Sequence, residues 1–423
     1  MKNSQIISWR SGILMFLALS VVLSSCGRSE KLEPVTASGK SEKKEEMLRW
    51  YYGTNVSQEM AETVAHDYYE QTGVCVEWIN AETVSTRAAF ASGEAPDIYT
   101  VSLYELQDWE PRLLDLSGQP WEEDVFDISL ENATINGKLC GMPVTYEACG
   151  IIYNKDLFKQ AGIERLPKTV GELETVCQQL QSKGIQPFGE CYQLPGFAGH
   201  TLAVLFAHEE DPAAFTAMLS EGKKTIADME FYQQWLRLFE LMLDYGFGEK
   251  SIYYSVDDQV ADFAEGKMAM IKQGTWLERL IKTANPEIDM GIMPIPCTDS
   301  ESSCRLMVTT TNFLGVNKDS SRIRESLDFL EWLQCHAEEY LVQIEGLPVC
   351  YYSVDKNNSS TLYSEVSEYI SRGEVYEYFG SEGWPSGYDT DVRQVFSDYV
   401  TGVIRKEEIS AKLTDAFLIR SAE

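Results

Sequence analysis

Residues 47–101 read MLRWYYGTNVSQEMAETVAHDYYEQTGVCVEWINAETVSTRAAFASGEAPDIYTV, and this stretch decides the fold. Three short runs rich in apolar and aromatic residues, at 47–52, 74–79 and 97–101, predict buried strands. The segments between them have helical patterning, and Ser57 is a suitable N-cap for the first helix. Strands and helices that alternate at this spacing predict a parallel sheet with right-handed crossovers, so the fold class is α/β.

The ends of these strands predict where a ligand would bind. Open parallel sheets bind ligands outside the carboxyl ends of their strands. We therefore expect the turn at 53–57 and the segment Ser102–Tyr104 to lie near a binding site, with Tyr104 as a candidate contact.

The middle of the chain repeats this pattern. Ala148–Tyr153 and Met268–Ile271 predict strands, and Thr169 to Glu172 has the spacing of a capping box that opens a helix. The same spacing recurs from Thr275 to Glu278, which places Trp276 in the first turn of a helix directly after a strand. These segments predict a second sheet.

The first 46 residues predict export and a lipid anchor. The apolar stretch Gly12–Leu23 follows two cations, and as a helix it would rise about 18 Å, too little for a hydrocarbon core of about 30 Å. A signal peptide over residues 1–25 is favoured over a buried core helix. Leu23-Ser24-Ser25-Cys26 resembles the lipobox of bacterial lipoproteins, which implies a diacylated Cys26 at the outer face of the cell membrane. The alternative is an ordinary cysteine in a cleaved peptide. Residues 26–46 have too few apolar side chains to order themselves and predict a disordered tether.

The composition excludes several functions. A formal net charge of −31 argues against nucleic-acid binding, because Lys and Arg must neutralise phosphates there. It also disfavours a strongly anionic ligand unless basic residues gather locally. No Cys and His spacing predicts a metal site, and no motif predicts a cofactor. Nine cysteines follow Cys26, so not all of them can pair within the chain, and a disulfide between Cys297 and Cys304 stays open.

Several motifs occur in an order that is more specific than any one of them. They are Asn136–Val144 (NGKLCGMPV) with Glu147 and Ile151–Phe158 (IIYNKDLF), Pro167–Leu173 (PKTVGEL), Phe263–Met270 (FAEGKMAM) with Gly274–Trp276 (GTW), Gly291–Pro296 (GIMPIP) and Asn312–Asn317 (NFLGVN). In this order they resemble the family 1 extracellular solute-binding proteins of ABC transporters, the family of maltose-binding protein.

The resemblance implies a two-lobed periplasmic-binding-protein fold of class II. Each lobe would be a mostly parallel sheet flanked by helices. The chain would cross the hinge between them at about Pro143–Val144, Pro294–Pro296 and Leu333–Cys335. The first lobe would comprise residues 47–144 and 293–332, and the second 145–292 and 333–423. The two sheets predicted from the residues agree with this division.

The resemblance also implies site residues. It places Trp276 where a ring stacks on the ligand, Glu147 where a carboxylate faces it, and Asn55 among the polar contacts. A core tryptophan, a solvated or hinge-bonded glutamate and a turn-forming asparagine are the alternatives. Trp384 and Tyr388 are further candidates, because the Gly and Pro residues around them predict an exposed loop in which core packing explains these rings poorly.

Three other positions are weaker candidates for the site. Asp97 is expected to be structural, and Phe197 and His200, in a glycine-bearing loop, rank lower as contacts. The chain departs from maltose-binding protein after Asp97, where it reads Val101-Ser102-Leu103-Tyr104, so the resemblance implies the fold but does not specify a maltodextrin as the ligand.

The function that the resemblance implies is binding without chemistry. A monomer would capture a sugar or oligosaccharide between its lobes and pass it to an ABC permease in the membrane. Two other functions stay open. Acidic and aromatic residues also suit a polyamine or another small cation. Carboxylates are numerous enough for an exported, lipid-anchored glycosidase, although the sequence has no GxSxG, HExxH or P-loop motif.

Overall fold

The computed structural model describes residues 47–53, 56–81, 83–355, 360–377 and 384–422. The predicted signal peptide, Cys26 and the tether lie outside these residues, as does Asn55. Within the described ranges, no helix is both long enough and apolar enough to cross a membrane.

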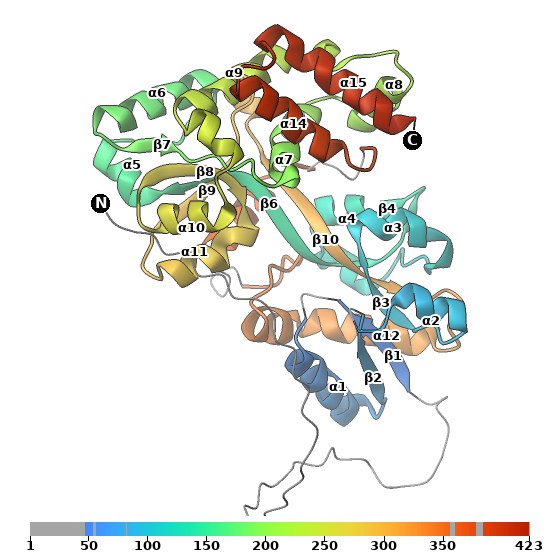
Figure 1. Cartoon of the computed structure of the whole chain (residues 1–423). Helices are drawn as coiled ribbons and strands as arrows, with labels where there is room; N and C mark the ends of the chain where they lie inside the picture. The colour runs from blue at the N-terminus through green and yellow to red at the C-terminus, as the bar shows by residue number, and fades with distance from the viewer. Residues whose placement is uncertain (1–46, 54–55, 82, 356–359, 378–383, 423) are drawn as a thin grey trace, which may run out of the picture. The chain divides into compact units, whose positions relative to one another are not determined.

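The first strands form the parallel arrangement that the sequence predicts. Strand β1 (Leu48–Tyr52) lies between β2 (Val76–Asn80) and β3 (Ile98–Ser102) and pairs in parallel with both. Helices α1 (Gln58–Thr72) and α2 (Thr86–Ser92) make the crossovers (Figure 1). The expected N-cap is present, since the Ser57 side chain accepts a hydrogen bond from the Met60 amide.

The prediction of a second sheet needs correction, because two long strands join all the main strands into one. Strands β6 (Met142–Asn154) and β10 (Leu306–Val316) run side by side and antiparallel. Strand β10 also pairs with β3, and β6 also pairs with β8 (Met268–Gly274). The other strands of this sheet are β7 (Gln186–Phe188), β9 (Met290–Met293) and β11 (Val375–Glu377). The order is β2-β1-β3-β10-β6-β8-β7, with β11 paired to β10 and β9 to β6. Strands β4 (Thr134–Ile135) and β5 (Lys138–Leu139) form a separate two-stranded sheet.

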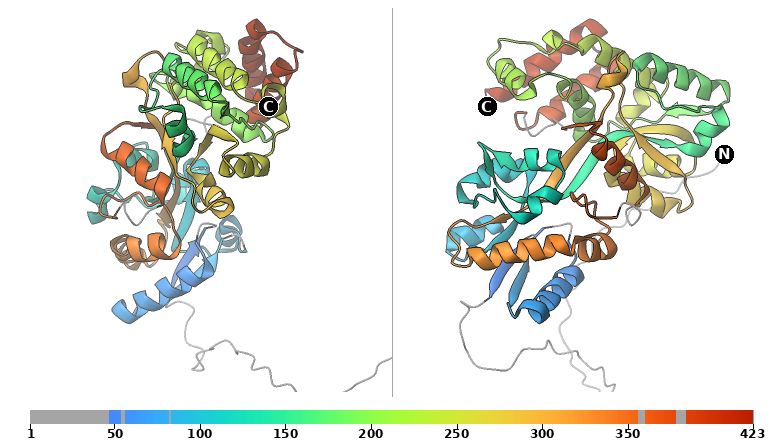
Figure 2. Two further views of the ribbon diagram at one scale, coloured as in Figure 1. Left: turned by 90° about the vertical axis from the view of Figure 1, so that its left-hand side faces the viewer. Right: turned by 180° about the vertical axis from the view of Figure 1, so that it is seen from behind.

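Helices cover both faces of this sheet. Their bounds are α3 (Leu103–Trp109), α4 (Asp127–Ala133), α5 (Lys155–Ala161), α6 (Val170–Ser182), α7 (Pro195–Phe206), α8 (Pro212–Ser220), α9 (Tyr232–Asp244), α10 (Val256–Ala264), α11 (Glu278–Ala284), α12 (Ile323–Cys335), α13 (Thr361–Ser371), α14 (Tyr388–Val400) and α15 (Ile409–Ser421). Helix α12 packs across the β1–β3 part of the sheet (Figure 2), where the rings of Phe329 and Trp50 lie 5.3 Å apart.

Strand β6 is mostly apolar because it is buried on both faces of the sheet. All but one of its residues are buried, and alternate side chains enter hydrophobic clusters on opposite faces. Ile152 belongs to the cluster that continues under α10 and α11, and Ile151 to the cluster under α7, α9 and α14. All nine cysteines of the described residues are free thiols, so Cys297 and Cys304 form no disulfide.

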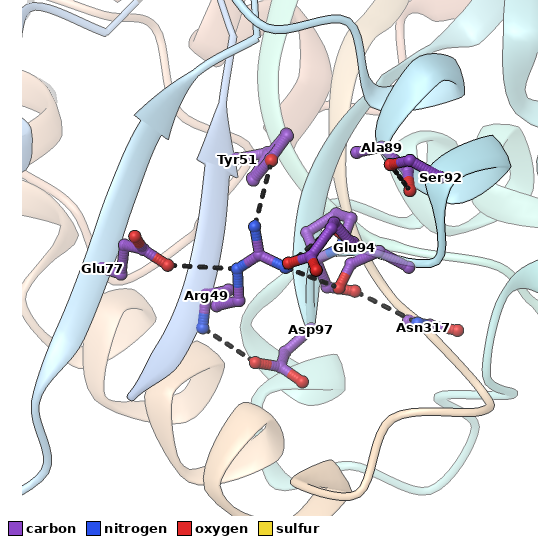
Figure 3. Close-up of polar contacts among 10 residues, drawn as sticks. Arg49, Tyr51, Glu77, Ala89, Ser92, Glu94, Asp97 and Asn317 are labelled. Atoms are coloured by element: carbon purple, nitrogen blue, oxygen red, sulfur yellow. Dashed lines mark hydrogen bonds and ion pairs between the residues drawn. The ribbon is translucent and has the colours of Figure 1, made fainter. Parts of the chain in front are cut away.

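Asp97 has the structural role expected of it. Its carboxylate accepts hydrogen bonds from the Arg49 amide at 2.8 Å and from the Ser320 hydroxyl at 2.5 Å. The Arg49 side chain extends toward β2, where its Nε lies 3.1 Å from the Glu77 carboxylate (Figure 3). These contacts join β1, β2 and the loops beside them at the end of the strands opposite to the expected ligand edge.

The cap of α1 offers a test of the local structure. Ser57 Oγ accepts from the Met60 amide at 3.1 Å, and both its amide and its hydroxyl donate to the Glu345 carboxylate. Ser57→Ala removes the capping oxygen, so we expect the free energy of unfolding to fall by about 1 kcal/mol in urea titrations. Ser102→Ala is the matched control, because Ser102 precedes α3 without a capping bond. Equal losses in the two variants would contradict the capping role.

Candidate functional site

A cavity of about 550 Å³ lies where β6, β10 and three other segments, 275–282, 345–348 and 360–363, meet. It holds two of the predicted contacts, Glu147 and Trp276. Its lining residues are Thr145, Tyr146, Glu147, Thr275, Trp276, Glu278, Arg279, Lys282, Thr311, Glu345, Gly346, Leu347, Pro348, Ser360, Thr361 and Tyr363. The volume suits a small ligand rather than a macromolecular surface.

Trp276 lies in a short 3-10 turn, Thr275–Leu277, directly after β8. Its ring is half-buried, so it is not a fully enclosed core tryptophan. Gly274 allows this position, because a Cβ there would lie 2.1 Å from the indole ring. The ring centroid of His200 lies 5.2 Å away at an interplanar angle of 60°. The indole thus presents part of its surface to the cavity while its neighbours hold the rest.

Glu147 enters the cavity from β6. Burial raises the pKa of its carboxyl group, and no neighbouring charge or hydrogen bond offsets that burial. Among the residues that the structure describes, none donates a hydrogen bond to this carboxylate. The arrangement leaves a half-buried acceptor facing the same cavity as the Trp276 ring.

The other carboxylates of the cavity are already hydrogen-bonded. Glu278 accepts from the Leu362 amide at 3.2 Å and from the Ser360 hydroxyl at 2.5 Å. Glu345 accepts from Ser57. Glu147 is therefore the carboxylate of the cavity that the described protein leaves available to a ligand.

The second predicted capping box is wrong. Thr275 Oγ accepts from the Ala148 amide of β6 at 3.1 Å instead of capping its own helix. Glu278 binds the start of α13 rather than the backbone at Thr275. Both side chains are drawn into contacts distant in sequence, and these contacts tie the Trp276 turn to β6 and α13.

The cavity also holds hydroxyl groups that sequence reasoning missed. Thr145 and Thr311 approach each other across β6 and β10, with their hydroxyl oxygens 3.0 Å apart, and the Asn312 amide donates to both. The sequence could have indicated Thr145, because it lies two residues before Glu147 and its side chain therefore points to the same face of the strand. Thr311 depends on the antiparallel pairing of β10 with β6, which the sequence does not specify.

Tyr363 completes the wall from α13. The Tyr146 hydroxyl donates to the Tyr363 carbonyl at 3.1 Å, and the two rings meet edge to face at 5.9 Å. Burial raises the pKa of the Tyr363 hydroxyl, so it stays protonated and can donate a hydrogen bond at neutral pH.

Two of the predicted contacts lie elsewhere. Trp384 and Tyr388 are buried, with 7% and 1% of their surfaces exposed, in the cluster under α7 and α14. The Trp384 ring lies 5.0 Å from that of Phe206, and the Tyr388 hydroxyl donates to the Leu413 carbonyl. Core packing explains both, so the prediction that these two rings lie in an exposed loop is wrong.

Tyr104 lies in α3, but its side chain is outside the described part of the structure, as is Asn55.

His200 and Phe197 lie closer to the site than the sequence predicts. Both rings lie on α7, and the His200 ring lies between those of Phe197 and Trp276. Burial, with help from the nearby Lys272, lowers the pKa of His200 to about 3. The Lys272 ammonium donates to the Phe197 carbonyl at 3.1 Å. His200 is thus a neutral packing partner of Trp276 rather than a titrating contact at physiological pH.

The cavity offers several kinds of group that can bind a ligand. It combines an aromatic face, an unpaired carboxylate, hydroxyl groups and the cations Arg279 and Lys282. Within the described ranges, no group of three or more His, Cys, Asp or Glu residues could hold a metal ion.

Comparison with known proteins agrees with this architecture. Residues 53–338, more than half of the chain, match the family model described as bacterial extracellular solute-binding protein. The multiple sugar-binding protein of Streptococcus mutans is 23% identical over 372 residues, covering 83% of this chain and 84% of its own. The melibiose/raffinose/stachyose-binding protein MelE of Bacillus subtilis is 23% identical over 341 residues, 77% of each chain.

The solved structures show the same fold. Apo RafE from Streptococcus pneumoniae superposes with a TM-score of 0.72 at 18% identity, over 90% of this chain and all of that one. The α/β class is confirmed by this likeness and by the observed order of strands and helices. The chain therefore belongs to the bacterial extracellular solute-binding proteins, family 1.

Proposed function

We propose that this protein binds a sugar or oligosaccharide in the cavity beside Trp276 and delivers it to the permease of an ABC importer. The observation that carries the proposal is the half-buried Trp276 ring beside the unpaired carboxylate of Glu147. A flat apolar ring covers the C–H face of a sugar, and a carboxylate accepts charge-assisted hydrogen bonds from its hydroxyl groups. The names of two relatives, which specify multiple sugars and melibiose, raffinose and stachyose, support the same ligand class.

Binding would couple to closure of two lobes about a hinge, with ligand contacts on both favouring the closed form. We place the first two hinge crossings near Pro143–Val144 and Pro294–Pro296, as the resemblance implies. We place the third beyond Ser353 instead of at 333–335, because the residues between these positions contact the first lobe. The Tyr340 hydroxyl donates to Asp67 of α1, the Tyr351 hydroxyl donates to the Pro143 carbonyl, and the Ser353 amide donates to Asp124.

The setting of this activity would be the outer face of the cell membrane. The lipobox pattern at Leu23–Cys26 supports lipidation of Cys26, and residues 27–46 would form a tether behind it. A lipid anchor would raise the effective concentration of the binding protein at its permease. Growth with labelled palmitate tests this: wild-type protein should carry the label, and Cys26→Ala should not.

Titration calorimetry against sugars tests the proposed function. The panel would contain melibiose, raffinose, stachyose, maltodextrins and their monosaccharides, and at least one should bind with a Kd on the order of 1 μM, about −8 kcal/mol. Spermidine is the contrasting ligand, because a carboxylate and aromatic rings also suit a cation. Binding of spermidine and of no sugar would overturn the proposal, and turnover of a bound glycan would favour the glycosidase alternative.

A further inference from the structure

Two glutamine side chains lie fully inside the protein behind Trp276. Gln259 projects from α10 with no exposed surface, and Gln273 projects from β8 with 1% exposed. A buried amide is destabilising unless its donor and acceptor atoms are hydrogen-bonded. These two side chains satisfy that requirement through each other, through the Gly189 carbonyl and through Trp276.

The three side chains form one line of hydrogen bonds. Gln259 Nε2 donates to the Gly189 carbonyl at 2.5 Å, and Gln273 Nε2 donates to Gln259 Oε1 at 2.8 Å. At the cavity end, Trp276 Nε1 donates to Gln273 Oε1 at 3.3 Å. The line connects the loop after β7 to the ring in the ligand cavity.

The two ends of this line fix the direction of both amides. The Gly189 carbonyl can only accept and the Trp276 indole can only donate. Gln259 must therefore turn its NH₂ group to Gly189, which leaves its oxygen for Gln273. Gln273 must then turn its own oxygen to the indole. A reversed amide at either position would set two donors or two acceptors against each other.

The rest of the indole is also restrained. Gly274 lies under the ring so closely that a Cβ would be 2.1 Å from it, and the His200 ring lies at its side. The hydrogen bond to Gln273 restrains the indole edge. Together these contacts favour one orientation of the ring.

We propose that Gln259 and Gln273 are positioning residues that preorganise the Trp276 ring for stacking on the ligand. The inference rests on the proposed function, because it concerns the same cavity. A ring that is ordered before binding loses less rotational freedom when the ligand stacks on it. Neither glutamine lines the cavity, so both act through the ring.

Calorimetry on Gln273→Leu and Gln259→Leu tests the inference. Each variant should bind the best sugar of the panel about three- to tenfold more weakly than wild type, since one side chain is ordered less well. Gln186→Leu is the matched control: its amide donates to the Phe188 and Tyr245 carbonyls beside the same sheet and does not contact Trp276. That variant should melt at a lower temperature and keep its affinity.

A double-mutant cycle separates positioning from general destabilisation. Trp276→Phe keeps an aromatic ring but has no N–H to donate, so it should lower the affinity by itself. In that background Gln273→Leu should change the affinity by less than about twofold, because the partner of its oxygen is already gone. Additive losses, or full affinity in a folded Gln273→Leu protein, would overturn the inference.

A spectroscopic measurement keeps the test independent of the ligand. The indole N–H resonance of Trp276, assigned by its loss in Trp276→Phe, should be shifted and protected from solvent exchange in wild type. Gln273→Leu should shift it and speed its exchange, and Gln186→Leu should not. If wild type binds no sugar of the panel but these spectra behave as expected, the proposed function fails and the positioning of the ring stands. An unchanged resonance in Gln273→Leu would contradict the positioning.

Discussion

Replacing Trp276 by alanine is expected to weaken sugar binding at least about tenfold, which corresponds to about 1.4 kcal/mol of binding free energy. The alanine removes the ring that would cover the apolar face of the sugar, and an aromatic contact adds roughly 0.5–1.5 kcal/mol to the effect of the buried area alone. Titration calorimetry of wild type and variant with the same sugar measures the difference. The ring is half-buried at the cavity wall, so the variant should still fold.

Trp384→Phe is the control that separates the cavity from the core. Trp384 packs against Phe206 and Tyr388 in the buried cluster. Its substitution should lower the free energy of unfolding by about 0.5–3 kcal/mol and leave the affinity unchanged. If Trp276→Ala keeps full affinity, Trp276 is not a ligand contact. If Trp384→Phe loses affinity at unchanged stability, the ligand lies near Trp384 instead.

Local sequence signals predicted the parts of the fold that depend on neighbours in the chain. Ser57 caps α1 and Thr169 caps α6 as expected, because an N-cap acts on amides two or three residues away. The alternation of strands and helices from 47 to 101 correctly predicted the parallel pairing of β1, β2 and β3, because these strands follow one another closely in the chain. The single sheet was not predicted. It depends on β6 and β10, whose antiparallel pairing joins residues more than 150 positions apart.

The errors in the candidate site have the same physical origin. Thr275 and Glu278 have the spacing of a capping box, but partners on β6 and α13 take both side chains. Trp384 lies among turn-forming residues, which correctly indicates a loop, yet the sequence carries no information on whether Phe206 covers that loop. Trp276 and Glu147 were found through motifs, and the cavity brings them together through contacts that no local pattern encodes.

Glu147→Gln is expected to change affinity and stability in opposite directions. An amide in place of the carboxylate loses the charge-assisted hydrogen bonds to sugar hydroxyl groups, worth about 1.5–3 kcal/mol, so affinity at pH 7 should fall at least about tenfold. Burial raises the pKa of Glu147 above its usual value of 4.5 without a compensating partner. Ionisation of this group therefore opposes folding, and the glutamine variant should be more stable than wild type at pH 7.

The pH dependence distinguishes this account from a simple packing effect. At pH 4, below the usual value of 4.5, the carboxyl group is mostly protonated in both the folded and the unfolded states, so wild type and Glu147→Gln should differ little in stability. As pH rises through the raised pKa, the folded wild type must give up a proton that it holds more tightly than the unfolded chain does. Its stability therefore falls relative to the variant and then stays lower. Urea titrations of both proteins at pH 4 and pH 7 measure this difference, with the exposed Glu164→Gln as control. If the two proteins differ in free energy of unfolding by the same amount at both pH values, Glu147 is not an unpaired buried carboxylate.

The affinity of wild type should also decline toward acid pH while that of the variant stays constant, because only the wild-type group loses its charge.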